Sequence, residues 1–214
     1  MAKIALLAGS TGLIGSQLLE LLLNDNQYSS VVAISRKPIS SANAKLTNLV
    51  CELRDLSSHK SQLKADDVFC CLGTTIKKAK SKEAFRAIDL EAPLQMAKIS
   101  KELGAKKFML VSSLGANKNS GVFYNKVKGE VEGAIEQVGF ETFHILRPSL
   151  LLGPRKEERA GEDAAKFFYK IFGFLVPKKY QAIESIKVAR AMIAYSRQAQ
   201  SGIFIHESGQ LQNF

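Results

Sequence analysis

Tyr124 and Lys128 are four residues apart in a stretch with helical spacing, so their side chains share one face of that helix. A phenol is a poor proton donor at neutral pH, but a nearby ammonium favours the phenolate form. Ser112 and Ser113 end an apolar run upstream, and a serine hydroxyl can hydrogen-bond a substrate oxygen on which charge develops. The set Ser113, Tyr124 and Lys128 predicts an enzyme that moves a hydride to a small carbonyl compound, or from the alcohol, with Tyr124 as proton donor.

Two other interpretations of this set stay open. Tyr124 can be the surface tyrosine of an amphipathic helix, with Lys128 as its solvated neighbour. Alternatively, the residues line a bound cofactor without turning anything over, which would make the protein a redox-responsive binding protein. Ser112 also competes with Ser113 for the serine role, in which we favour Ser113.

A glycine-rich turn lies near the N-terminus, between an apolar run and a helical pattern. In dinucleotide-binding folds such glycines allow a tight turn, a close approach to the pyrophosphate and close packing of helix on strand. The helix that follows offers free N–H groups to phosphates. We therefore expect the cofactor pyrophosphate on Gly9, Ser10, Thr11, Gly12, Leu13, Ile14 and Gly15. A tight turn without a ligand is the alternative.

The end of the second expected strand indicates which nicotinamide cofactor is bound. NAD enzymes usually place a carboxylate there to accept hydrogen bonds from the ribose 2′-hydroxyl. Here the chain reads Ser35-Arg36-Lys37. Arg36 can clamp a 2′-phosphate in bidentate fashion and Lys37 adds a second positive charge, so we expect NADP(H). The alternative is that both are ordinary exposed loop residues.

Further cofactor contacts are expected at the ends of other strands. Asp55 and Leu56 follow the third strand, where the carboxylate can meet the adenine amino group or instead cap the next helix. The small-residue turn Leu72-Gly73-Thr74 follows the fourth strand. Ligands of open α/β sheets lie at this carboxyl edge, where Ser112 and Lys128 are expected as well.

The order of the elements indicates the fold class. Apolar runs that read as strands alternate with helical patterns, which predicts right-handed crossovers and a mostly parallel sheet. The expected strands cover residues 3–8, 31–35, 46–51, 67–72, 107–111, 142–146 and 202–206, and the expected helices residues 13–23, 82–103, 124–138, 163–172 and 186–198. We predict one Rossmann-like α/β domain over 1–214, doubly wound, with about seven strands and a small helical substrate-side cap within 150–200.

The amino-acid composition limits the class of protein, its compartment and its ligands. The 46% hydrophobic and 23% charged residues are typical of a soluble globular protein, and no apolar run is long enough to span a bilayer. Three cysteines, two of them adjacent, argue against a disulfide framework and favour the cytoplasm. Three scattered histidines predict no metal site. The net charge of +10 suits an anionic ligand, and we expect no specific nucleic-acid partner because no aromatic residues interleave with the lysines.

Five segments resemble the atypical short-chain dehydrogenase/reductases, and within them the Tat-interacting-protein oxidoreductase-like group. The segments are GSTGLIG, CLGTT (Cys71–Thr75), VSSLGA (Val111–Ala116), YNKVKGEVE (Tyr124–Glu132) and LRPSLLLGPR (Leu146–Arg155). The resemblance implies a seven-stranded Rossmann sheet that binds NADPH. It assigns Ser113 as the substrate-oxygen partner, Tyr124 as general acid/base and Lys128 as ribose ligand, and it implies that Arg147, Pro148 and Ser149 flank the nicotinamide.

Nucleotide-sugar epimerases share the glycine turn and the Tyr-x-x-x-Lys spacing. They normally carry a larger C-terminal domain that holds the nucleotide, and the short stretch after Arg155 argues against a sugar nucleotide. We therefore expect an NADP(H)-dependent oxidoreductase that acts as a monomer or a homodimer. A non-enzymatic NADP(H) sensor and an epimerase-like enzyme are the alternatives.

Overall fold

A seven-stranded sheet forms the centre of the computed structural model, which describes residues 2–153, 177 and 180–214. Its strand order is β3-β2-β1-β4-β5-β6-β9, and all neighbours pair in parallel. The strands are β1 (Lys3–Ala8), β2 (Tyr28–Ser35), β3 (Leu46–Val50), β4 (Asp67–Cys70), β5 (Lys107–Val111), β6 (Thr142–Arg147) and β9 (Gly202–Glu207). The predicted Rossmann-like fold class is confirmed, and each expected strand is present.

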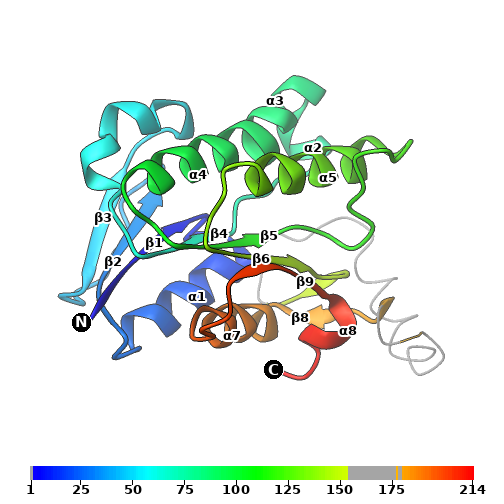
Figure 1. Cartoon of the computed structure of the whole chain (residues 1–214). Coiled ribbons are helices and arrows are strands. Elements are labelled where there is room, and N and C mark those ends of the chain that lie inside the picture. The colour runs from blue at the N-terminus through cyan, green and yellow to red at the C-terminus, as the bar shows by residue number, and fades with distance from the viewer. Residues whose placement is uncertain (1, 154–176, 178–179) are drawn as a thin grey trace.

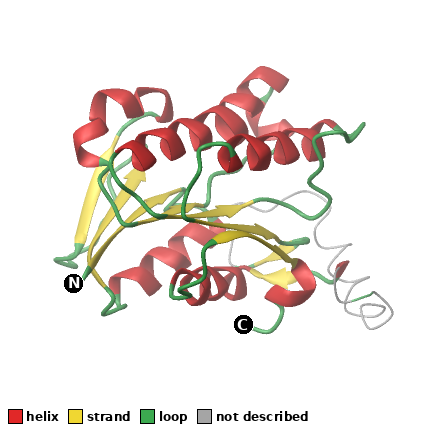
Figure 2. Ribbon diagram, in the orientation of Figure 1, coloured by secondary structure: helices red, strands yellow, loops and turns green. Residues whose placement is uncertain are grey.

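Helices cover both faces of the sheet (Figure 1, Figure 2). One layer holds α1 (Leu13–Leu23), α7 (Ser185–Ser196) and the short α8 (Ser208–Leu211). The opposite layer holds η1 (Leu53–Gln62), α2 (Ile76–Ala79), α3 (Lys82–Arg86), η2 (Ala87–Glu91), α4 (Ala92–Glu102) and α5 (Phe123–Glu136). Both layers are needed because each strand carries apolar residues on both faces.

The long helix expected over 82–103 is present, with a π-helical turn, η2, between α3 and α4. The sequence pattern does not locate this turn, because the turn covers only Ala87–Glu91 and apolar residues continue on both sides of it. The sequence also missed η1, α2, α8 and a short parallel pair, β7 (Leu151–Leu152) with β8 (Ile183–Glu184). α2, α8, β7 and β8 are too short for a periodic signal, and η1 is a mostly polar 3₁₀ segment in which Leu56 is the buried residue.

Part of the cap expected within 150–200 lies outside the described residues, as does the helix expected over 163–172. In the part that is described, α7 packs against α1 on one face of the sheet. The cap itself stays a prediction.

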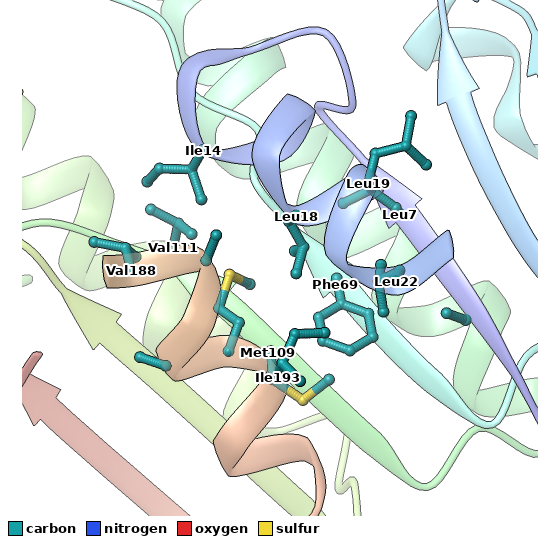
Figure 3. Close-up of a cluster of buried hydrophobic side chains, with 14 of the residues drawn as sticks. Leu7, Ile14, Leu18, Leu19, Leu22, Phe69, Met109, Val111, Val188 and Ile193 are labelled. Atoms are coloured by element: carbon teal, nitrogen blue, oxygen red, sulfur yellow. The ribbon is translucent and has the colours of Figure 1, made fainter. Parts of the chain in front are cut away.

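Alternating residues of β1 show how the two layers are joined. Ala5 and Leu7 belong to the core shared with α1 and α7, whereas Leu6 and Ala8 belong to the core under α4 and α5, and all four are fully buried. Figure 3 shows the first core, in which Leu18 of α1 and Ile193 of α7 approach the same strands. Side chains on both faces thereby hold β1 in one register.

The order of the strands reverses between β1 and β4. From β1 the chain winds outward through β2 and β3, and it then returns to the other side of β1 to form β4. In parallel sheets the crevice at such a switch point, outside the carboxyl ends of the strands, is where ligands bind. The residues that follow β1, β4 and β5 therefore meet at this edge.

Two histidines form a buried pair on the α7 side of the sheet. His144 of β6 and His206 of β9 approach to 3.0 Å between Nδ1 and Nε2, and the Tyr195 ring of α7 stacks on His206 at 3.6 Å between centroids. Burial lowers the pKa of both imidazoles to about 4. The folded protein consequently keeps both rings neutral at pH values where an exposed histidine is charged.

This pair should make the fold sensitive to mild acid. Between about pH 6.5 and about pH 4 the unfolded chain binds protons that the folded chain does not, so the free energy of unfolding falls as the pH falls. The effect is absent above this window. Urea denaturation at a series of pH values should show a shallower slope for His206→Gln than for the wild type, and equal slopes would contradict the expectation.

Candidate functional site

The glycine-rich turn is packed so tightly that two of its positions have no room for a side chain. Gly9 has a φ of +81°, and a Cβ there would lie 2.5 Å from the Cys71 carbonyl oxygen just beyond β4. A Cβ on Gly15 would lie 2.0 Å from the Gly9 carbonyl oxygen. Gly12 donates its N–H to that same oxygen at 2.9 Å and begins α1, and it is exposed, as is Thr11. The turn therefore presents bare backbone to solvent at the switch point, as a pyrophosphate cradle requires.

Two buried serines make hydrogen bonds at the end of the second strand. Ser10 donates from Oγ to the Ile34 carbonyl at 2.9 Å. Ser35 donates to the Lys37 carbonyl at 2.7 Å and accepts from Asn48 at 2.9 Å. These bonds shape the end of β2 and leave the side chains of Arg36 and Lys37 exposed beside the turn.

Asp55 and Leu56 of η1 are placed differently from each other. Asp55 is exposed in the first turn, whereas the Leu56 side chain is fully buried in the core. Glu52 occupies the cap position of η1. The alternative that Asp55 caps this helix is therefore wrong, and its contact with an adenine stays a prediction.

The turn after β4 lies against a buried ion pair. Leu72 is buried and Gly73 is exposed. The N–H of Thr74 donates to Asp89 Oδ2 of η2 at 2.9 Å, and Asp89 Oδ1 lies 2.8 Å from Lys128 Nζ. Burial alone would lower the pKa of Lys128, but Asp89, together with Tyr124 and Cys70, outweighs the effect of burial, and this pKa is raised. Lys128 is thus a fixed positive charge at the cofactor edge of the sheet.

The two serines after β5 differ in what their hydroxyls can do. Ser112 donates from Oγ to Glu132 of α5, and its backbone N–H donates to the Leu146 carbonyl at 2.7 Å. Ser113 Oγ is buried and has no hydrogen-bond partner among the residues that the structure describes. A buried hydroxyl without a partner is costly unless a ligand completes it. Only Ser113 of the two has a hydroxyl left for a ligand oxygen.

Tyr124 lies in the first turn of α5, half-buried, with its ring 5.6 Å from the Phe85 ring. The loop that begins at Ser113 is held against this turn, because the Asn117 N–H donates to the Asn125 carbonyl at 3.0 Å. A Cβ on Gly129 would meet the Lys118 nitrogen at 2.1 Å, so the loop also rests directly on the α5 backbone. The fold thus brings the three predicted residues of the hydride-transfer set to one edge.

Arg147, expected beside the nicotinamide, is engaged by two carboxylates. Its Nε and Nη2 donate to Glu132 at 3.1 and 2.6 Å, and its Nη1 donates to Glu207 of β9 at 3.1 Å. The hydrogen bonds to Glu132 raise the pKa of Arg147. The next two residues join other segments, since the Pro148 carbonyl accepts from the Leu114 N–H and Ser149 donates to the Gln181 carbonyl. Contacts of this segment with a cofactor stay predictions.

Burial disfavours the reactive thiolate form of the two thiols near this edge. Burial raises the pKa of Cys70 to about 11 and that of Cys71 well above its ordinary value, and a protonated thiol is a weak nucleophile. Across residues 2–153, 177 and 180–214, no group of three or more His, Cys, Asp or Glu side chains is arranged to hold a metal ion. Over the same ranges, no helix is long and apolar enough to cross a membrane.

Two carboxylates of the site were missed by the sequence analysis. Asp89 shares a helical face with the buried Phe85, Ala92 and Met96, and a carboxylate at such a core position needs a buried partner. Glu132 follows Lys128 by four residues and therefore lies on the same face of α5. The sequence signal that could have identified both carboxylates is an acidic residue at a core position of a helix.

Known proteins resemble this chain in both sequence and structure. The profile of a family described as NAD(P)H-binding matches residues 9–195. Protein HTATIP2 of Rattus norvegicus is 35% identical over 198 residues, which cover 89% of this chain and 80% of the relative. Protein FMP52, mitochondrial, of Candida albicans is 40% identical over 154 residues, which cover 70% of this chain and 67% of the relative.

Two solved structures show the same fold. MoeE5 in complex with UDP-glucose and NAD has a TM-score of 0.73 at 17% identity, over 94% of this chain and 74% of that one. The Bordetella bronchiseptica enzyme WbmH in complex with NAD⁺ has a TM-score of 0.73 at 16% identity, over 97% of this chain and 76% of that one.

The packing of the glycine turn can be separated from its backbone strain by a matched pair of substitutions. Gly9 and Gly104 both have left-handed φ values, but a Cβ on Gly104 would meet nothing within 4 Å. Gly104→Ala should cost about 1–2 kcal/mol from strain alone. Gly9→Ala should cost more, and it should also abolish nicotinamide-cofactor binding, measured by denaturation and calorimetry. Equal losses of stability would show that the contact with Cys71 has no effect.

Proposed function

The chain belongs to the NAD(P)H-binding family, and from this membership we propose that it is an NADP(H)-dependent oxidoreductase of the short-chain dehydrogenase/reductase type. Its substrate is a small carbonyl compound or the corresponding alcohol. The observation that carries the proposal is the buried Ser113 hydroxyl without a partner in the described structure, at the edge where Tyr124 and Lys128 also lie.

Each residue of this set has one task. When bound, the cofactor supplies or accepts the hydride at the substrate carbon. Ser113 donates a hydrogen bond to the substrate oxygen, and Tyr124 transfers its phenolic proton to that oxygen as the carbonyl becomes an alcohol. The Lys128 ammonium stabilises the phenolate form of Tyr124 that results. Solvent then returns a proton to this phenolate. Ser112 supports the site by its bond to Glu132.

Arg36 and Lys37 support NADP(H) rather than NAD(H) as the cofactor. The residues at the end of β2 include no carboxylate that would repel a 2′-phosphate. An exposed guanidinium can bind a phosphate through two parallel hydrogen bonds. The bonds of Ser35 to Lys37 and Asn48 hold the backbone of this segment in place for such a contact.

Replacing Arg36 should change which cofactor is preferred. Arg36→Asp removes the phosphate clamp and adds an acceptor for a ribose hydroxyl, so NADPH affinity should fall by about 10–100-fold while NADH affinity rises. Calorimetric titration of both cofactors measures this reversal. Arg190→Asp, at an exposed position of α7, is the matched charge control. Equal affinities of the wild type for NADPH and NADH would contradict the assignment.

Tyr124→Phe should retain cofactor affinity and lose turnover. The variant keeps the ring against Phe85 but lacks the proton, so kcat should fall by about 10²–10⁴-fold. The measurement is the absorbance of NADPH at the nicotinamide band with a panel of aldehydes, ketones and quinones. Ser113→Ala should also lower kcat, whereas Ser112→Ala should act on stability, because its hydroxyl is bonded to Glu132.

The panel also separates the competing functions. Tight NADPH binding without turnover of any compound above the level of Tyr124→Phe would favour a non-enzymatic redox-responsive binding protein. Turnover of a UDP-sugar would favour an epimerase-like enzyme, since MoeE5 has been crystallised with UDP-glucose and NAD. The cytoplasmic location stays a prediction, because several fungal relatives are named as mitochondrial proteins. The oligomeric state, monomer or homodimer, also stays a prediction. So does the expectation that no nucleic acid is bound specifically.

A further inference from the structure

Asp89 is a carboxylate in the apolar interior. It lies on the π-helical turn η2, its side chain is fully buried, and the neighbours on its helical face are Phe85, Ala92 and Met96. A carboxylate at such a position is costly unless it is paired and hydrogen-bonded. π-Helical turns are frequent at functional sites, where they redirect a side chain that an α-helix would place elsewhere.

The two oxygens of Asp89 face two parts of the proposed site, one in an ion pair and one in a hydrogen bond. Oδ1 lies 2.8 Å from Lys128 Nζ, and Oδ2 accepts the Thr74 N–H at 2.9 Å. A Cβ on Gly73 would lie 3.6 Å from Oδ1 and 3.8 Å from Lys128 Nζ. The ion pair is thus directly beneath the turn that follows β4, at the cofactor edge of the sheet.

The charged and titratable groups that act on Lys128 come from three elements. They are Asp89 of η2, Cys70 of β4 and Tyr124 of α5 itself. Burial raises the pKa of Cys70 to about 11, so the thiol is neutral at physiological pH. Burial acts against the charge on Lys128, and Asp89 offsets it. Asp89 is the carboxylate that the structure pairs with this buried ammonium.

We infer that Asp89 is a positioning residue of the cofactor site, which holds the Lys128 ammonium in register with the Gly73–Thr74 turn. An ammonium has three donors, and the bond to Asp89 leaves two for a ligand. The inference rests on the proposed function in that Lys128 contacts the cofactor. Asp89 itself touches no reacting atom and acts through Lys128.

The variant Asp89→Asn isolates the charge. The amide keeps the shape and one oxygen that can accept the Thr74 N–H, but it offers no negative charge to Lys128. Glu91→Gln removes a charge from an exposed position of the same turn and is the matched control. Lys128→Met alone and combined with Asp89→Asn completes a double-mutant cycle.

The first readout is the stability of the cofactor-free protein against pH. In the wild type the raised pKa of Lys128 means that its stabilising contribution is present below the unfolded value of about 10.4 and is lost above it. In Asp89→Asn, burial without the carboxylate should bring this pKa below the unfolded value. Stability should then rise with pH between about pH 7 and about pH 10. The slope should vanish when Lys128→Met is added.

The second readout is NADPH affinity, measured by fluorescence titration over the same pH range. Asp89→Asn should weaken binding by about 10-fold, more at alkaline pH, while Glu91→Gln should leave binding unchanged. In the Lys128→Met background, Asp89→Asn should have no further effect. An equal loss in both backgrounds, or wild-type pH dependence in Asp89→Asn, would overturn the inference.

The two hypotheses fail in different ways. If the wild type binds NADPH but reduces no compound, the reductase proposal fails while both readouts still report on Asp89. If turnover is found but the cycle shows no coupling between Asp89 and Lys128, the inference fails and the proposed function stands. A wild type that does not bind NADPH overturns the cofactor role of Asp89, whatever the stability slopes show.

Discussion

The contact between the Gly9 backbone and the Cys71 carbonyl is the constraint on which the rest of the structure depends. It lies between β1 and β4, where the strand order reverses, and it is possible only because position 9 has no Cβ. Gly15 extends the same packing into α1. The carboxyl edge is therefore formed by bare backbone at the glycine turn, and the predicted site residues come to this edge from the end of β5 and from α5.

A buried ion pair fixes α5 to η2, and a partly buried one fixes α5 to the sheet. Lys128 pairs with Asp89 of η2, and Glu132 pairs with Arg147 at the end of β6. Buried pairs of this kind add little net stability, but removing one partner leaves an uncompensated charge. The two pairs fix the rotation of α5 about its own axis and its position along that axis. The position of Tyr124 follows from both. The same Glu132 accepts the hydrogen bond of Ser112, whereas the neighbouring Ser113 hydroxyl has no partner among the described residues.

The elements that bury long apolar runs could be predicted from sequence, because periodicity reports directly on which face is buried. β1, α1 and β5 agree with their expected bounds. Contacts between charged residues far apart in the chain could not be predicted. Arg147 follows a strand at the ligand edge, and only the folded chain brings Glu132 and Glu207 to its guanidinium. The difference between the two serines could not be predicted either, because Ser112 is bonded to Glu132, a residue of another element.

The spacing along α5 has an evolutionary consequence. Tyr124, Lys128 and Glu132 follow one another at steps of four residues on a single rigid helix. Deleting one residue between Tyr124 and Lys128 would rotate the phenol by about 100° relative to the two anchored charges. Insertions and deletions can therefore accumulate in the loop before α5, whereas the helix can accept substitutions but no change in length. Homologous chains should align across these nine positions without a gap.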